Sequence, residues 1–418
     1  TQRKTKILAT LGPSSNTIKK IIELSKAGAN TFRLNCSHLN EEGLKDYVRK
    51  IRRAEKILNK PIGILVDLQG PKIRIGTLKN GENYLKKGSH FLFDLKKNIG
   101  DHRRVTLPHK KIFSSVKKGH LILLDDGKIH LKVTSVKIGE IRTKVLQGGY
   151  LKSNKGVNLP QTNIKTSALS TIDKKFASLA VQEGVDWIAL SFVQKPNDIK
   201  ELKKICSNKA SIMAKIEKPS ALDYLDQITN LADGIMIARG DLGVELPIES
   251  VPGWQKKIIR VARVKGKPVV VSTQMLESMT SSLTPTRAEV SDVANAVFEG
   301  ADAIMLSAES ASGDYPIETV QMMNKIAINI EKDSNYSDIL SSQLEETPDT
   351  TPDAIATAAK TLADELSSPI IVCYTESGST GIKVSRVRPS QIILTITPVI
   401  QTARKLSLAW GVLCFLQK

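Results

Sequence analysis

The chain has 418 residues, of which 41% are hydrophobic and 25% charged, and its formal net charge is +19. This length favours two or three domains, and the composition excludes a largely disordered protein. No apolar run reaches the ~18 residues that span a bilayer, and the N-terminus lacks the long apolar region of a signal peptide. A cytoplasmic protein with no membrane partner is therefore expected.

The cysteines and histidines restrict the choice of metal. The four cysteines are far apart and form no CxxC pair, which argues against a zinc site or a disulfide framework. All the histidines lie between His38 and His130. A metal held by the later two-thirds of the chain would be a hard cation on oxygen ligands, with Mg²⁺ as the first choice.

The positive charge raises the question of nucleic-acid binding. The basic residues are scattered along the sequence, and aromatic residues make up only 4%, too few for extensive base stacking. We favour a basic surface that attracts small anionic substrates, and expect no nucleic-acid partner.

In chain order, the predicted elements begin with three short apolar strands at 6–10, 31–35 and 62–67, separated by helical stretches. Five more strands follow later, at 187–191, 211–216, 234–238, 268–273 and 303–306. Apolar strands that alternate with helices indicate a parallel sheet covered on both faces. Eight of them favour an α/β fold of the (β/α)₈ TIM-barrel type, with a doubly wound sheet as the alternative.

The interval between residues 67 and 187 is too long for one βα connection. Turns such as 79–81 and 125–127 separate alternating strands such as 128–133 there. We expect a small all-β lid domain at 71–155, inserted between barrel segments 1–70 and 156–335.

The last part of the chain, 336–418, is predicted to be a C-terminal α/β domain. A polar segment at 335–353 is interpreted as the linker, followed by a helix at 354–366 and strands at 370–374, 392–397 and 412–416. The loop at 374–381 between a strand and a helix is compatible with a phosphate cradle and equally with a simple turn.

Working residues of such a barrel gather where its strands end. Because side chains two apart on a strand share a face, Lys215 and Glu217 point to the same side. Glu217 and Asp241 follow neighbouring strands, so together they can hold one Mg²⁺, and the lysine can neutralise charge in a transition state. Surface ion pairs are the alternative interpretation.

Three further polar side chains at strand ends have less specific signals. Arg33 suits phosphate through its bidentate donors, or else makes a structural salt bridge. The hydroxyls of Thr273 and Ser307 can orient a carboxylate or pass a proton, or simply bond to the local backbone.

Eight segments of the sequence resemble pyruvate kinases, and several of them are long and specific. They are 5–15 (TKILATLGPSS), 32–38, 67–74, 155–160 (KGVNLP), 215–217, 239–247 (RGDLGVELP), 273–279 (TQMLESM) and 300–316. The resemblance implies Mg²⁺-dependent phosphoryl transfer from phosphoenolpyruvate to ADP in glycolysis, giving pyruvate and ATP after the enolate is protonated. It also implies a homotetramer, and Mn²⁺ as a substitute metal.

The resemblance implies a role for each matching residue. Lys215 resembles the lysine that stabilises the transferring phosphoryl group and the enolate oxygen, and Arg33 the phosphate clamp. Glu217 and Asp241 resemble the Mg²⁺ ligands. The other implied contacts are Gly240, Asp241 and Thr273 with phosphoenolpyruvate, Asn35, His38, Arg74 and Lys155 with the nucleotide, and Thr273, Ser307 and Glu309 with the path that protonates the enolate.

Two departures from the family pattern carry expectations of their own. Asn35, Ser37 and Asp67 match a K⁺ site of many members, but Leu68 replaces a threonine and Lys72 a glutamate. This resembles the K⁺-independent branch, in which the lysine ammonium replaces the cation. The family's C-terminal domain normally continues for about two more strands, so this one resembles either a natural short form or a truncated one. Glu376 argues against regulation by fructose 1,6-bisphosphate.

Two other functions compete with this interpretation. Another Mg²⁺-dependent barrel enzyme acting on phosphoenolpyruvate or an enolate, an aldolase or lyase, would have no reason for a lid that carries Arg74 and Lys155. A non-catalytic basic binding protein would be expected to lose site residues such as Lys215 and Arg33, and both are present.

Overall fold

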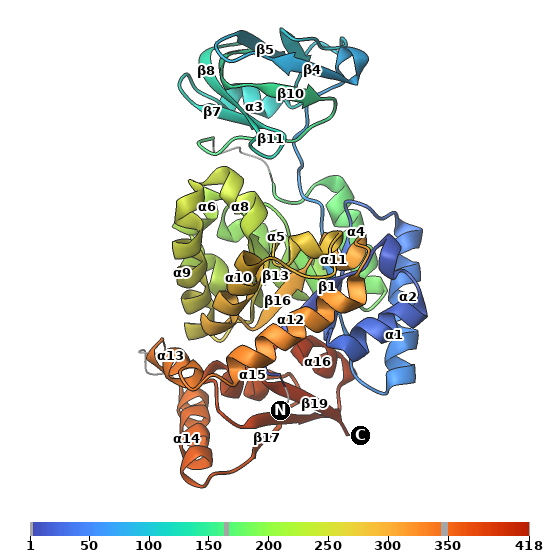
Figure 1. The fold of residues 1–418 in the computed structure, drawn as a ribbon, viewed down its shortest axis with the longest axis vertical. Helices are drawn as coiled ribbons and strands as arrows, with labels where there is room; N and C mark the ends of the chain where they lie inside the picture. The colour runs from blue at the N-terminus through green and yellow to red at the C-terminus, as the bar shows by residue number, and fades with distance from the viewer. Residues whose placement is uncertain (1–2, 163–166, 344–349, 418) are drawn as a thin grey trace.

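A computed structural model describes residues 3–162, 167–343 and 350–417 (Figure 1). Its centre is a closed barrel of eight parallel strands in the order β1-β16-β15-β14-β13-β12-β3-β2. The strands are β1 (Lys6–Thr10), β2 (Thr31–Asn35), β3 (Gly63–Asp67), β12 (Trp187–Leu190), β13 (Ser211–Ile216), β14 (Gly234–Ala238), β15 (Val269–Ser272) and β16 (Ala303–Leu306). The closed barrel confirms the predicted fold class and rules out the doubly wound alternative.

Four helices of the barrel begin at a polar side chain that caps them. Thr17, Asn40, Ser170 and Thr286 each accept a hydrogen bond from a backbone N–H of the first turn. The helices are α1 (Ile18–Ala27), α2 (Glu41–Leu58), α4 (Thr171–Gln182), α5 (Pro196–Cys206), α6 (Pro219–Asp223), α7 (Leu225–Leu231), α8 (Arg239–Glu245), α9 (Val251–Val264), α10 (Arg287–Phe298), α11 (Ala308–Ala311) and α12 (Pro316–Glu331).

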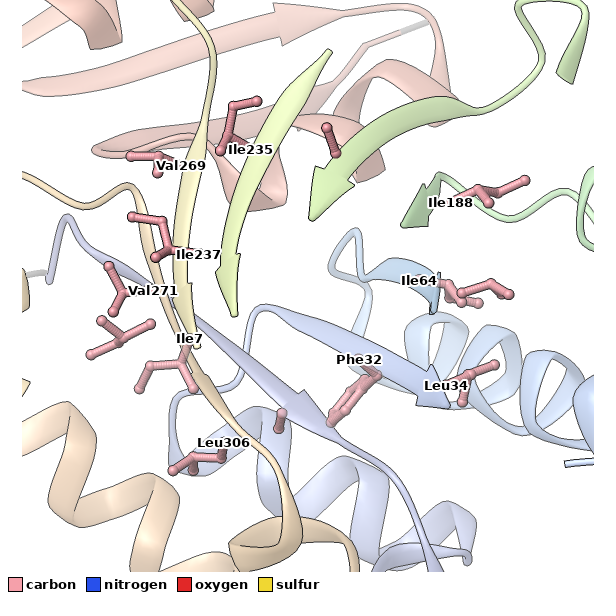
Figure 2. Packing of buried hydrophobic residues seen from close by; sticks show 14 of the residues in the cluster. Ile7, Phe32, Leu34, Ile64, Ile188, Ile235, Ile237, Val269, Val271 and Leu306 are labelled. Carbon is pink, nitrogen blue, oxygen red and sulfur yellow. The ribbon is translucent and has the colours of Figure 1, made fainter. Parts of the chain in front are cut away.

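The barrel strands are buried on both faces, as their continuous apolar sequences require. Side chains such as Phe32, Ile188 and Val271 point outward and pack under the helices (Figure 2). A second cluster, with Trp187 and Met236, fills the interior. The barrel is therefore a solid support whose strand ends stay fixed.

The lid, which we define as residues 71–155, lies beyond the carboxyl ends of the barrel strands (Figure 1). Its sheets have the orders β11-β7-β8-β9-β5-β6 and β10-β4, and it has a separate hydrophobic cluster. Its elements are β4 (Glu82–Leu85), β5 (His90–Asp94), β6 (Arg104–Thr106), α3 (Lys110–Ser115), β7 (Leu121–Leu124), β8 (Ile129–Lys137), β9 (Glu140–Gln147) and β10 (Gly149–Lys152), and β11 (Val157–Asn158) follows.

The C-terminal part packs on the opposite end of the barrel from the lid (Figure 1). Its parallel strands, in the order β17-β18-β19, have the predicted bounds. The elements are α14 (Thr351–Glu365), β17 (Ile370–Tyr374), α15 (Ser379–Arg386), β18 (Ile392–Thr397), α16 (Ile400–Lys405) and β19 (Val412–Leu416). Among the described residues, no helix is both long and apolar enough to cross a membrane.

The prediction of a linker over 335–353 was wrong for much of that segment. Helix α13 (Tyr336–Ser342) lies within it, and α14 already begins at Thr351. Tyr336 and Leu340, one helical turn apart, are buried against the barrel helices. The other residues of the segment are mostly polar, so these two gave too weak a signal to predict a helix. Residues 344–349 of the predicted linker lie outside the described residues.

Candidate active site

A chain of alternating charges lies across the strand ends of the barrel. Asp67 ends β3, and its Oδ2 lies 2.7 Å from both Nε and Nη2 of Arg33 on β2. Its Oδ1 lies 3.1 Å from Nζ of Lys215 on β13, and that Nζ lies 2.8 Å from Oε1 of Glu217. Asp67 and Glu217 are each only 1% exposed and Lys215 9%, so these charges are held by one another rather than by water.

The neighbours of Lys215 keep it charged although it is buried. Burial alone would lower its pKa, but Asp67 and Glu217 outweigh burial and raise it. Burial would likewise raise the pKa of Asp67, and Lys215 and Arg33 reverse that effect and lower it. The site therefore presents a fixed ammonium and a fixed guanidinium.

Glu217 and Asp241 are suited to a divalent cation. Burial is the main cause that raises the pKa of Glu217, and the charge of Asp241, in the first turn of α8, raises it further against the opposing effect of Lys215. A cation between the two carboxylates would offset the cost of burying the Glu217 charge and its repulsion by Asp241. An all-oxygen donor pair fits Mg²⁺ or Mn²⁺. The described residues contain no cluster of three or more His, Cys, Asp and Glu arranged for a metal.

The loop after β15 is strained and clamped. Thr273 has φ +69° and Gln274 φ +54°, a conformation that is costly for a β-branched residue such as threonine. Thr273 Oγ1 accepts a hydrogen bond from the N–H of Gly240 at 2.7 Å, and Arg239 Nη2 donates to the Thr273 carbonyl at 2.7 Å. The surrounding contacts thus hold the Thr273 hydroxyl beside the start of α8.

Glu309 joins that loop to the end of β16. It is fully buried, and burial raises its pKa. Its Oε2 accepts from the N–H of Ser307 at 2.7 Å, and its Oε1 from the N–H of Leu276 at 3.3 Å. Both carboxylate oxygens bind backbone, so Glu309 is placed to position the loop, while Ser307 itself stays half-buried at the strand end.

A cavity of 380 Å³ separates the lid from the barrel and is lined by Lys72, Lys110 and Lys111 from the lid and by Lys218 and Asp241 from the barrel, among others. Its lining thus combines four ammonium groups with one of the candidate metal ligands. Such a lining suits an anionic ligand that carries phosphate groups.

The predicted nucleotide contacts are only partly brought together. Arg74 and Lys155 lie at the base of the lid, where Arg74 donates to the Asn154 carbonyl at 2.8 Å and Lys155 lies 2.7 Å from Asp125. Neither of the two lines the cavity. His38 is exposed in the turn after β2, on the barrel side.

The residues predicted around the K⁺ site lie in two places. Asn35 is opposite Asp67 in the register of β2 and β3, and its Oδ1 accepts from the N–H of Ser37 at 3.1 Å. Lys72 is exposed in the cavity lining. Within the described ranges, no hydrogen bond or ion pair joins the Lys72 ammonium to these three residues.

Sequence reasoning missed several residues of the site. The N–H of Phe192 donates to Oε2 of Glu217 at 2.7 Å. Phe192 has φ +55°, a conformation that no sequence pattern predicts for phenylalanine. Lys218 lies 2.5 Å from Glu245 at the end of α8, and Asn158 of β11 donates to the same carboxylate at 2.9 Å. Lys218 directly follows Glu217, so its position at a strand end was a usable signal.

Comparison with known proteins identifies the family. The family model "Pyruvate kinase, barrel domain" matches residues 2–320, and "Pyruvate kinase, alpha/beta domain" matches 353–418. The chain is 52% identical to a pyruvate kinase of Methylorubrum extorquens, over 98% of this chain and 86% of that one, and 48% identical to one of Agrobacterium vitis, over 99% and 88%. A crystal structure of a pyruvate kinase from Cryptosporidium parvum superposes with a TM-score of 0.96 at 34% identity, covering 99% of this chain and 87% of that one. The chain belongs to the pyruvate kinase family.

Proposed function

We propose that this member of the pyruvate kinase family transfers the phosphoryl group of phosphoenolpyruvate to ADP at the charge chain around Lys215. The observation that carries the proposal is the buried ammonium of Lys215, kept charged by Asp67 and Glu217 beside a second carboxylate, Asp241. Phosphoryl transfer demands positioning and positive charge more than covalent chemistry, and these groups supply both. An aldolase or lyase is not favoured by the family assignment.

Glu217 and Asp241 would hold the divalent cation, Mg²⁺ or in its place Mn²⁺. When bound, the cation would supply positive charge at substrate oxygens, with the remaining ligand positions filled by substrate and water. The family generally uses Mg²⁺. The specific assignment of these two ligands is our proposal.

The other side chains would bind and orient the substrate. The Arg33 guanidinium, held by Asp67, would clamp the phosphate, and the Lys215 ammonium would face the transferring group and the enolate oxygen. The N–H of Gly240 and the hydroxyl of Thr273 would receive the carboxylate, after their present mutual hydrogen bond opens.

The same loop would also deliver the proton to the enolate. The Thr273 hydroxyl lies beside the start of α8, and Ser307 follows the neighbouring strand β16. Glu309 accepts backbone hydrogen bonds from Ser307 and from Leu276, which belongs to the loop that carries Thr273. We assign the proton path to the hydroxyls and bound water, and a positioning role to Glu309.

The nucleotide would bind between barrel and lid. The ammonium groups that line the 380 Å³ cavity would face its phosphates, with Asn35 and His38 on the barrel side and Arg74 and Lys155 on the lid side. Because Arg74 and Lys155 lie outside the cavity lining, the lid would have to move for them to reach the phosphates. The domain limits 1–70, 71–155, 156–335 and 336–418, a homotetramer, and a cytoplasmic location complete the proposal.

The test is the release of pyruvate from phosphoenolpyruvate and ADP with Mg²⁺. Replacing Lys215 by Met should lower kcat by at least 10³-fold, because charge that develops in the transition state loses its nearest cation. Lys209→Met, at an exposed position two residues before β13 begins, is the matched control and should stay within twofold of the wild type.

Loss of Lys215 leaves Glu217 buried without its cation and leaves Asp67 with Arg33 alone, which lowers the stability of the variant. Lys215→Arg keeps the charge, and circular dichroism reports folding of each variant. A folded wild type without turnover, or a folded Lys215→Met that retains it, would overturn the assignment.

A further inference from the structure

The lid holds most of the net charge of the protein. Residues 71–155 contain 20 Lys and Arg against 6 Asp and Glu, which gives +14 of the formal +19. From the sequence, the scatter of basic residues argued against a nucleic-acid partner. That argument no longer applies, because the lid, about one-fifth of the chain, holds most of the excess positive charge in one compact unit.

One face of the lid sheet presents a row of basic side chains. In the register of β8, β9 and β5, Lys132 lies opposite Lys144, and Lys144 lies opposite His90. All three are exposed, and Arg142 shares their face two residues before Lys144. Like charges directly opposite on neighbouring strands destabilise a sheet. An anionic partner on this face would offset that cost.

A groove of 840 Å³ lies beside this row and is lined by Lys86, Arg103 and Arg142, all exposed, as well as by His90. We call it the outer groove. Figure 1 places β4 and β5, which contribute to it, at the end of the lid away from the barrel. The outer groove is thus separate from the substrate cavity, and substrate attraction into that cavity does not account for it.

Two tyrosines provide an aromatic platform at the outer groove. Tyr84 lines it, and Tyr150 lies opposite Tyr84 in the pairing of β4 with β10. Their side chains are 55% and 65% exposed, and their rings meet edge to face with centroids 5.1 Å apart. Solvent-facing aromatic rings beside a basic groove are the combination with which proteins stack unpaired bases.

We propose that the outer groove binds a single-stranded nucleic acid. The phosphates lie along the cations of the groove, and unpaired bases stack on Tyr84 and Tyr150. A duplex keeps its bases stacked internally and gives the tyrosines no contact. A bilayer surface is flat and does not fill a groove, so the concave shape favours a strand.

The experiment is fluorescence anisotropy of a labelled 12-nucleotide RNA of mixed sequence, with the full chain, Mg²⁺ and ADP, between 50 and 300 mM KCl. About four phosphate contacts predict a slope near −3 for log K against log salt, since each contributes about −0.7. Tyr84→Ala with Tyr150→Ala should weaken binding about tenfold or more with the slope unchanged. Lys86→Glu with Arg103→Glu should weaken it more strongly and make the slope shallower.

The matched control is Lys117→Glu with Lys118→Glu, an equal charge change in the same lid at exposed positions outside the groove lining. It should weaken RNA binding far less than the groove pair. Pyruvate formation should stay within twofold in all these variants, which shows that each lid is folded.

Four results would overturn the proposal: no RNA binding at 100 mM KCl, equal losses in the groove and control pairs, an unchanged affinity in the tyrosine variant, or equal affinity for a duplex of the same length. Vesicles of phosphatidylglycerol and phosphatidylcholine that bind while RNA does not would assign the basic face to a membrane surface instead.

Discussion

At the scale of single residues, we propose that Lys72 takes the place of a monovalent cation and makes the activity independent of K⁺. It is exposed in the cavity lining, on the lid side of the site, whereas Asn35 and Asp67 end neighbouring barrel strands. Its ammonium can replace K⁺ only when the lid brings it closer to them. The K⁺ independence that we propose therefore depends on a lysine whose final position is set by lid closure.

Wild-type turnover should accordingly change less than twofold between 100 mM K⁺ and 100 mM tetramethylammonium. Lys72→Glu should lower turnover without K⁺ at least tenfold, and added K⁺ should restore it, because the carboxylate then needs a cation beside it. Lys110→Glu carries the same charge change in the same cavity and should gain no K⁺ dependence. A tenfold stimulation of the wild type by K⁺ would contradict the assignment.

At the scale of elements, the contact between β11 and α8 ties the lid to the barrel. Asn158 donates to Glu245, which is buried and also pairs with Lys218. A hydrogen bond to a charged acceptor is among the stronger ones, and this one holds the lid over the cavity. Its loss should leave the lid less firmly placed over the cavity in which the nucleotide would bind.

Asn158→Ala should thus raise the KM for ADP about three- to tenfold and leave kcat within about twofold. Asn158→Asp should raise the KM further, since it places a second carboxylate against Glu245. Steady-state kinetics with ADP varied at saturating phosphoenolpyruvate measures both effects. A KM for ADP that stays at the wild-type value in both variants would show that this contact does not control the lid.

The elements also show what the sequence can and cannot predict. The barrel strands were predictable because most are short apolar runs followed by a polar residue, as at 303–306 before Ser307. Helix α13 was not, because only Tyr336 and Leu340 anchor a polar segment. In the site, the nearness of Lys215 to Glu217 followed from the two-residue period of a strand, whereas the backbone conformation of Phe192 and the position of the lid depend on tertiary contacts.

At the scale of the whole molecule, Lys6 links the barrel to the C-terminal part. Its Nζ donates to the carbonyl of Val412 at 2.7 Å, and the side chain is buried. Burial is the main cause that lowers its pKa from 10.5 to about 7, and Arg3 and Lys60 add to the effect. The interface therefore prefers a neutral amine.

The pH dependence of stability follows from this shift. Between pH 7 and 10.5 the unfolded chain binds a proton at Lys6 that the folded chain has lost, so raising the pH stabilises the folded state. Below pH 7 Lys6 is charged in both the folded and the unfolded state, so the cost of burying its charge no longer changes with pH. The contribution changes by at most about 1.4 kcal/mol per pH unit, and only within this window.

Lys6→Met removes the titrating group and keeps most of the volume. Its Tm should exceed that of the wild type most at pH 6.5, and the difference should shrink steadily by pH 9.5, because the wild type regains stability as Lys6 loses its proton. Other groups that titrate in this range act on both proteins and cancel in the difference. A Tm difference that does not change with pH would mean that Lys6 keeps an ordinary pKa, and that the barrel and the C-terminal part are joined across a hydrated, charged contact.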